Sequence, residues 1–323
     1  MHEGDYRSLS TVSVMFIICY IRRGSSFFFI QTLSISLILL SAIFRADIKM
    51  VNITAEMFKS RLSILQDFFQ DNISLKTAVD TLASTSLLDA TSTEGAVGRL
   101  WGLIIACARE MPEHQDKLVS ILVNLSKLPD ARTESDEPLT LHDMQVWKDL
   151  PTLGWHFRNE WNGPSVPGPD SPPESRQKAI SDFINVNRFT ALLMATEEPV
   201  FNYSWFALVT LREALETPPK ELPPTAPLDT CIPAAAVWIE VLGVEIYEWD
   251  EEFEHGPLVG APGRGGPLWN GKHGFCEDRW ALWRERFGEL ARMEDVSGLG
   301  EQTRTTAREA ELMMRQIENG DVL

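Results

Sequence analysis

The feature that most constrains this sequence is an apolar repeat with the pitch of an α-helix, which begins near residue 50. Phe58, Leu62, Leu65 and Phe69 recur at spacings that place them on one face of a helix. Alternating apolar runs joined by tight turns, which would indicate β-hairpins, do not stand out. The pattern therefore predicts an all-α fold in which helices pack on helices.

Helix boundaries can be predicted from capping residues and breakers. Ser74 is a candidate N-cap, Pro112 stops an apolar helix, and Gly243 and Gly320 are candidate C-terminal stops. We expect about nine or ten helices in a single irregular bundle over residues 50–323, with long loops rich in Pro and Gly. The predicted segments are 58–69, 75–82, 93–111, 115–128, 141–161 with a break at Pro151, 177–196, 203–216, 228–243, a helix opened by Glu277, and 301–319.

Residues 1–49 form an apolar prefix of a different character. Residues 25–44 are twenty mostly apolar positions without a charge, which matches the length of a membrane-spanning helix. Three interpretations stay open: a signal anchor, a cleaved signal peptide, or an extension of the gene model upstream of a start at Met50. We favour the third, because the chain after Met50 runs directly into an amphipathic helix. A membrane is an expected partner only if residues 25–44 are retained.

The net charge limits the possible classes of binding partner, and the cysteine pattern indicates the cellular compartment. The chain carries 29 Lys and Arg against 46 Asp and Glu, a formal net charge of −17. Such an acidic surface repels phosphate backbones, so we expect no nucleic-acid partner. The four cysteines are scattered and form no CxxC pair, which is typical of a reduced, cytoplasmic protein.

Charged residues inside apolar helical segments form the first candidate site, because burying a charge is costly unless it is paired. They are either internal ion pairs that fix helix packing, which we favour, or the lining of a pocket for acid–base chemistry. The candidates are Arg99, Arg212, Glu213, Glu216, Glu240 and Arg279.

Tryptophans form the second candidate site. Trp280, Trp283 and Phe287 share one helical face, and Trp238 lies in another apolar segment. Aromatic side chains bury the most area, so a core role is favoured over an aromatic wall for a ligand made by Trp238, Trp280 and Trp283.

No metal, cofactor or catalytic residue is predicted. His255, His273 and Cys276 lack a second ligand pair at metal spacing. The acidic run at 250–254 is best interpreted as a solvated loop. Residues 266–273 match a GxxxxGK phosphate loop only in part, because a His replaces the hydroxyl residue and no strand precedes it.

Six segments taken together resemble the fungal domain of unknown function 3632. They are residues 98–110, 147–162, 189–195, 206–216, 232–243 and 271–291. The resemblance covers most of residues 50–323 and excludes the apolar prefix. It implies an α-helical, intracellular protein, and it transfers no activity, cofactor or catalytic residue.

The sequence therefore favours a non-enzymatic helical protein that binds a partner or a small molecule. One alternative is a hydrolase-like enzyme that uses the Arg/Glu group, and another is a helical domain anchored in a membrane through residues 25–44.

Overall fold

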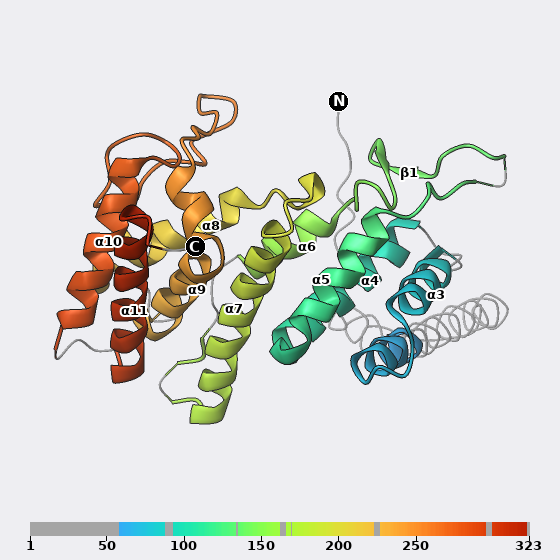
Figure 1. Ribbon diagram of the computed structural model, residues 1–323, viewed down its shortest axis with the longest axis horizontal. Coiled ribbons are helices and arrows are strands. Elements are labelled where there is room, and N and C mark those ends of the chain that lie inside the picture. Colours follow the sequence, from blue (N-terminus) through green and yellow to red (C-terminus); the bar gives the residue numbers. More distant parts are fainter. Residues whose placement is uncertain are drawn as a thin grey trace, which may run out of the picture. The chain divides into compact units, whose positions relative to one another are not determined.

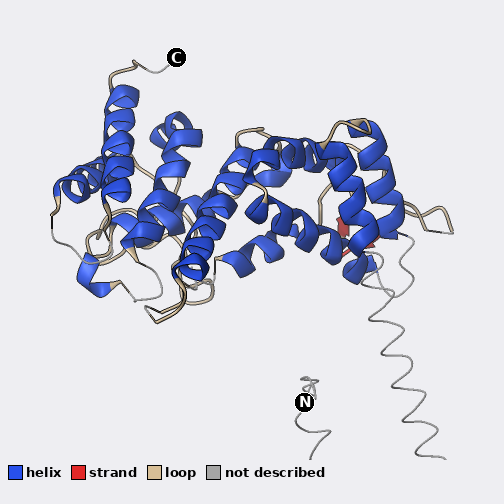
Figure 2. Ribbon diagram, turned by 90° about the horizontal axis from the view of Figure 1, so that it is seen from below, coloured by secondary structure: helices blue, strands red, loops and turns tan. Residues whose placement is uncertain are grey.

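Ten α-helices, three short 3₁₀-helices and one small hairpin make up the secondary structure that the computed structural model describes (Figure 1). The described residues are 58–87, 93–133, 135–161, 166–168, 170–222, 227–294 and 299–321. Figure 2 shows how completely helices dominate them. The predicted all-α fold is confirmed, whereas the predictions for residues 1–49 lie outside the described residues.

The helices follow the apolar repeat closely. Ser74 caps α3 as predicted, since its Oγ accepts a hydrogen bond from the Thr77 amide at 3.1 Å. The first described helix covers residues 58–69. The others are α3 (Leu75–Leu87), α4 (Thr93–Glu110), α5 (Gln115–Ser126), α6 (Leu153–Glu160), α7 (Pro173–Met194), α8 (Ser204–Leu215), α9 (Leu228–Glu248), α10 (Glu277–Arg292) and α11 (Glu301–Glu318). Strands β1 (Thr140–Leu141) and β2 (Met144–Gln145) pair antiparallel.

Two apolar helices organise the packing within residues 60–323, which form one compact unit. Helix α4 packs against α3, α5, α6 and α7, and helix α9 packs against α7, α8, α10 and α11 (Figure 1). Helix α7 contacts both, so one continuous hydrophobic core runs through the unit. The predicted domain boundary between residues 49 and 50 lies outside the described residues.

The helix predicted over residues 141–161 is wrong in its first half. His142 and Asp143 have φ values of 53° and 61°, and they form the turn between β1 and β2. Leu150 and Thr152 have φ values of 43° and 68°, so α6 begins only at Leu153. Left-handed backbone cannot continue a right-handed helix. Because Leu and Thr rarely adopt left-handed angles, the sequence does not predict this interruption.

The predicted stop at Gly243 falls beside a kink, because Leu242 has non-helical angles of φ −131° and ψ 22°, but α9 resumes after the kink and continues to Glu248. A Cβ on Gly243 would lie 2.6 Å from Cδ1 of Ile317, so this glycine lets α11 approach α9 closely. Of the described helices, α9 alone is long and apolar enough to cross a membrane, with a mean hydropathy of 1.4. In this fold 61% of that apolar window is buried, as in the core helix of a bundle.

Candidate functional site

Two of the predicted charged residues meet in the core. Glu216 follows the last residue of α8, Arg279 lies in the first turn of α10, and neither side chain is exposed to solvent. Arg279 donates from Nε to Glu216 Oε1 at 2.6 Å and from Nη2 to Oε2 at 3.1 Å. We call this bidentate ion pair the clasp. Its geometry is the fork-to-fork arrangement that gives the strongest charge-assisted hydrogen bonds.

The clasp holds the chain segment of residues 249–276, which connects α9 to α10 and is called the excursion below. Arg279 Nη1 donates to the carbonyl oxygens of Gly263 at 3.0 Å and Gly274 at 2.7 Å. The Gly266 amide donates to Glu216 Oε2 at 2.7 Å, and the Trp283 indole donates to Oε1 at 2.8 Å. The charged pair is therefore tied to backbone groups of the excursion.

Glycines let the excursion approach itself and the clasp. A Cβ on Gly263 would lie 2.2 Å from the carbonyl oxygen of His273, and one on Gly274 would lie 1.9 Å from that of Glu251. Both distances are far inside van der Waals contact with backbone, which cannot move aside. The Gly-rich composition of this region thus reflects close packing, and the amide of Gly266 binds Glu216 in the segment that resembles a phosphate loop.

The remaining charged candidates do not all converge on the clasp. Arg212 donates to the carbonyl oxygens of Pro262 and Arg264 at 3.4 and 3.3 Å, so it also holds the excursion. Burial lowers the pKa of Arg212, and the carboxylates of Glu213 and Glu216 oppose that shift.

Three candidates lie at the surface or in another helix. Glu213 is exposed on α8. Glu240 is exposed on α9 and pairs with Arg188 at 2.7 Å. Arg99 lies half-buried on α4; burial lowers the pKa of Arg61, and the charge of Arg99 lowers it further. The structure therefore joins Glu216, Arg279 and Arg212, and leaves Glu213, Glu240 and Arg99 outside the clasp.

The three candidate tryptophans lie in the core, and each indole N–H has a polar partner. Trp238 donates to Asn187 Oδ1 at 2.8 Å, and Trp280 donates to Glu318 Oε1 at 2.9 Å. Trp283 donates to Glu216, as described above, and its ring lies 5.5 Å from the Arg279 guanidinium. Their exposed fractions are 0% to 1%, so they line no open surface.

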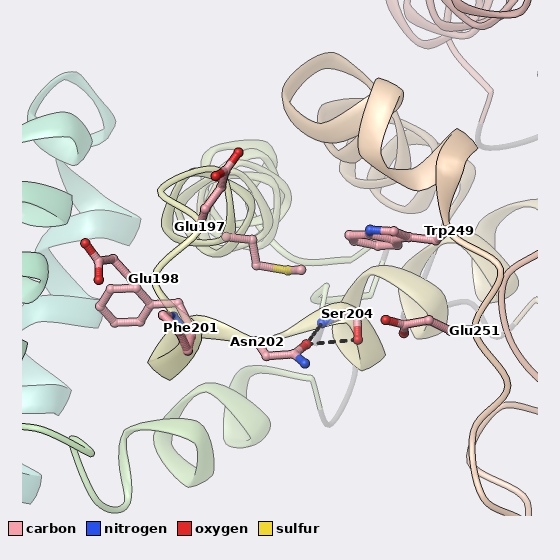
Figure 3. Close-up of a pocket in the computed structure, with 9 residues that line it drawn as sticks. Glu197, Glu198, Phe201, Asn202, Ser204, Trp249 and Glu251 are labelled. Carbon is pink, nitrogen blue, oxygen red and sulfur yellow. Dashed lines mark hydrogen bonds between the residues drawn. The ribbon is translucent and has the colours of Figure 1, made fainter.

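An open cavity of about 210 Å³ lies where the ends of three helices meet (Figure 3). Met194 ends α7, Ser204 begins α8, and Trp249 follows α9. The full lining is Met194, Glu197, Glu198, Pro199, Phe201, Asn202, Ser204, Trp249 and Glu251. We call it the three-helix cavity. Trp249 and Glu251 belong to the excursion, so the segment that the clasp holds also forms one wall.

A second hollow of about 450 Å³ shares Glu198 and Pro199 with the three-helix cavity. It is lined by side chains of both signs, among them Lys127, Lys148 and Asp149. Lys127 lies 2.5 Å from Glu198 and neutralises it. This hollow therefore presents no single charge to a ligand.

Sequence reasoning missed the residues of the three-helix cavity. Glu251 belongs to the acidic run that was predicted to be a solvated loop. Trp249 was not part of any predicted helix. Asn202 and Ser204 join two helices in a short polar turn, where the Ser204 amide and hydroxyl both donate to Asn202 Oδ1. No local pattern brings these three segments together, so only the tertiary fold identifies them.

The two places differ in what they can do chemically. Glu216 is fully buried, and its two oxygens accept four hydrogen bonds, so a substrate has no route to it. The three-helix cavity opens to solvent and carries carboxylates, a hydroxyl, an amide and an indole. Among the described residues, no group of three His, Cys, Asp or Glu side chains is placed to hold a metal ion.

Comparison with known proteins gives one match. The model of the family described as "Protein of unknown function (DUF3632)" matches residues 101–287, from α4 to α10, and this range includes the clasp and the three-helix cavity. No curated protein and no solved structure matches the chain. Because the family match covers more than half of the 323 residues, the chain belongs to the DUF3632 family of proteins of unknown function.

Proposed function

We propose that this protein is a non-enzymatic helical binding protein, which takes a small molecule or a group of a partner protein in the three-helix cavity. The observation that carries the proposal is the clasp. A connection as long as the excursion is usually either disordered or functional, and this one is fixed from inside by a buried ion pair. A fixed wall beside an open cavity is what pre-organised binding requires.

The clasp also weighs against the alternative of a hydrolase-like enzyme that uses the Arg/Glu group for acid–base chemistry. Glu216 is the fully buried carboxylate of the candidate group, and it is held by Arg279, Trp283 and Gly266. These bonds explain why an arginine and a glutamate lie in the core without any reaction being required of them. We also propose a cytoplasmic location, on the scattered cysteines, and no nucleic-acid partner, on the net charge of −17.

A thermal-shift screen of a metabolite library on the full chain tests the proposal. We expect at least one compound to raise the unfolding temperature, because a ligand that binds only the folded state stabilises it by mass action. The shift should vanish when Trp249 is replaced by Leu and persist when Trp205, a half-buried tryptophan outside the cavity lining, is replaced by Leu.

Two outcomes would contradict it. If every stabilising compound acts equally on both variants, the three-helix cavity is not the binding site. If a stabilising compound is converted to a product in the presence of the protein, and the Trp249 variant loses that turnover, the protein is an enzyme.

A further inference from the structure

The three-helix cavity has the size of one ligand head group. Its volume of about 210 Å³ equals the liquid volume of about seven water molecules. Phe201, which is 1% exposed, closes its inner side, and Ser204 is 6% exposed. The cavity is thus a recess with a fixed floor, since the Ser204 hydroxyl is held by Asn202 at 3.1 Å.

The side chains that face the recess suit a positively charged group. Figure 3 shows Trp249 and Glu251 reaching toward Asn202 and Ser204, whereas Glu197 and Glu198 direct their carboxylates away. An indole face is the best aromatic partner for a cation, and the thioether of Met194 adds a polarisable contact. Among the described residues, no cation forms an ion pair with the Glu251 carboxylate.

Trp249 and Glu251 are held in place from behind. The Trp249 amide donates to the Glu245 carbonyl at 3.0 Å, and the Trp249 ring packs edge-on against Phe275 at 4.9 Å. The Glu251 carbonyl accepts the Phe275 amide at 2.9 Å, so the start of the excursion is paired with its end. The recess is therefore formed before any ligand arrives.

The backbone adds negative potential. Helices α7 and α9 both end at the recess, and the C-terminal end of a helix carries a partial negative charge. Helix α8 begins there with the opposite sign, but Asn202 already satisfies the first amide of α8. Lys127 neutralises Glu198 and Glu197 points away, so Glu251 is the lining carboxylate that faces a cation in the recess.

We propose that the three-helix cavity binds an alkylammonium group, through the Trp249 ring and the Glu251 carboxylate. This inference rests on the proposed binding function and names its ligand class. The group belongs either to a small organic cation or to a lysine side chain of a partner, because both present the same charge on the same alkyl stem. Anions are repelled by the Glu251 carboxylate, and neutral molecules lack the electrostatic attraction of a cation to the indole face.

Ligand-observed NMR on the full chain tests this inference. The probes are tetramethylammonium, n-butylammonium, the neutral n-pentanol and the anion butyrate. We expect the two ammonium ions to bind and the other two to bind at least about tenfold more weakly. Glu251→Gln and Trp249→Leu should each weaken ammonium binding by about tenfold, while Glu254→Gln, an exposed carboxylate outside the recess, should leave it unchanged.

A glycine-flanked lysine peptide distinguishes the two sources. If the peptide binds about tenfold tighter than n-butylammonium, the ligand is a side chain of a partner, and if the free cation binds as well as the peptide, the ligand is a small molecule.

Three results would overturn the inference: n-pentanol binding as tightly as n-butylammonium, no ammonium binding to the folded chain, or ammonium binding that survives both Glu251→Gln and Trp249→Leu. Folding of each variant is checked by circular dichroism, and Glu251→Gln changes only an exposed carboxylate. A neutral or anionic compound from the thermal-shift screen that depends on Trp249 would refute the ammonium ligand and leave the binding function intact.

Discussion

Glu216 and Arg279 are 63 residues apart in the chain and lie 2.6 Å apart in the core. Removing two charges from water is costly, and the clasp offsets that cost only because every contact is made together. Glu216→Gln leaves the Arg279 charge buried without its counterion, so we expect the free energy of unfolding to fall by about 3–5 kcal/mol. Urea denaturation measures this loss.

The double variant Glu216→Leu with Arg279→Met should cost less than the sum of the two single changes, because no unpaired charge remains. The exposed pair of Arg188 and Glu240 is the matched control, and Arg188→Met should cost at most about 1 kcal/mol. Additive losses at Glu216 and Arg279 would mean that the two side chains act independently and that the clasp is not a unit.

The cysteines give a second prediction at the residue scale. Burial raises the pKa of the Cys107 thiol to about 11 and that of the Cys231 thiol to about 12, whereas Cys276 is partly exposed. Only a thiolate reacts with iodoacetamide, so among the three cysteines that the structure describes, Cys276 should be labelled at about pH 8, and Cys107 and Cys231 should be protected. Peptide mass spectrometry reads the sites, and rapid labelling of Cys231 would contradict the burial of α9.

Among the helices, α11 owes its position to glycines on its neighbours. Gly243 on α9 faces Ile317, and a Cβ on Gly288 of α10 would lie 2.6 Å from the Glu311 carboxylate. We expect Gly243→Val to lower the free energy of unfolding by about 1–3 kcal/mol, because the added methyl groups overpack this contact. Ile317→Ala in the same chain should recover part of the loss, as thermal denaturation can show.

Gly102 is the control for that experiment. It lies exposed on α4, and a Cβ there would meet nothing within 4 Å. Gly102→Ala should therefore stabilise the chain by about 1 kcal/mol, the difference in helix propensity. If Gly243→Val also stabilised the chain, the close approach of α11 to α9 would be refuted.

Element boundaries mark where sequence reasoning holds and where it fails. The starts of α3 and α10 were predicted, because Ser74 and Glu277 act through their own helix ends. The predicted stop at Gly243 located the kink at Leu242 but missed the continuation of α9 to Glu248, because Gly243 packs against Ile317 of a different helix. The hairpin and turn before α6 depend on left-handed His142 and Thr152, and these residue types populate other regions far more often.

For the whole molecule, charge is the property that the sequence states most directly. A net charge of −17 makes like charges repel across the folded surface. Raising the NaCl concentration from about 0.01 M to about 0.1 M shortens the Debye length from about 30 Å to about 10 Å, so the unfolding temperature should rise. Differential scanning calorimetry measures it, with sucrose as an uncharged control, and a falling midpoint would contradict surface repulsion.

One part of the candidate site could be predicted from the sequence, and the other part could not. The sequence indicated that Glu216 and Arg279 would be buried, because charges inside apolar helices need partners. It gave no sign of the three-helix cavity, since Ser204, Trp249 and Glu251 act only through the packing of α7, α8 and α9. The family match shows that the chain belongs to the DUF3632 family, and it gives no information on the geometry of the cavity.

The way in which Arg279 grips the excursion has a consequence for engineering. The Arg279 guanidinium binds backbone carbonyl oxygens of the excursion, and Glu216 binds a backbone amide. These bonds do not depend on the side chains between Glu254 and Ala261. Foreign peptides grafted at those positions, with the glycines at 263 and 274 retained, should be displayed on the same anchored base. The clasp would then anchor loops of different sequence in the same way.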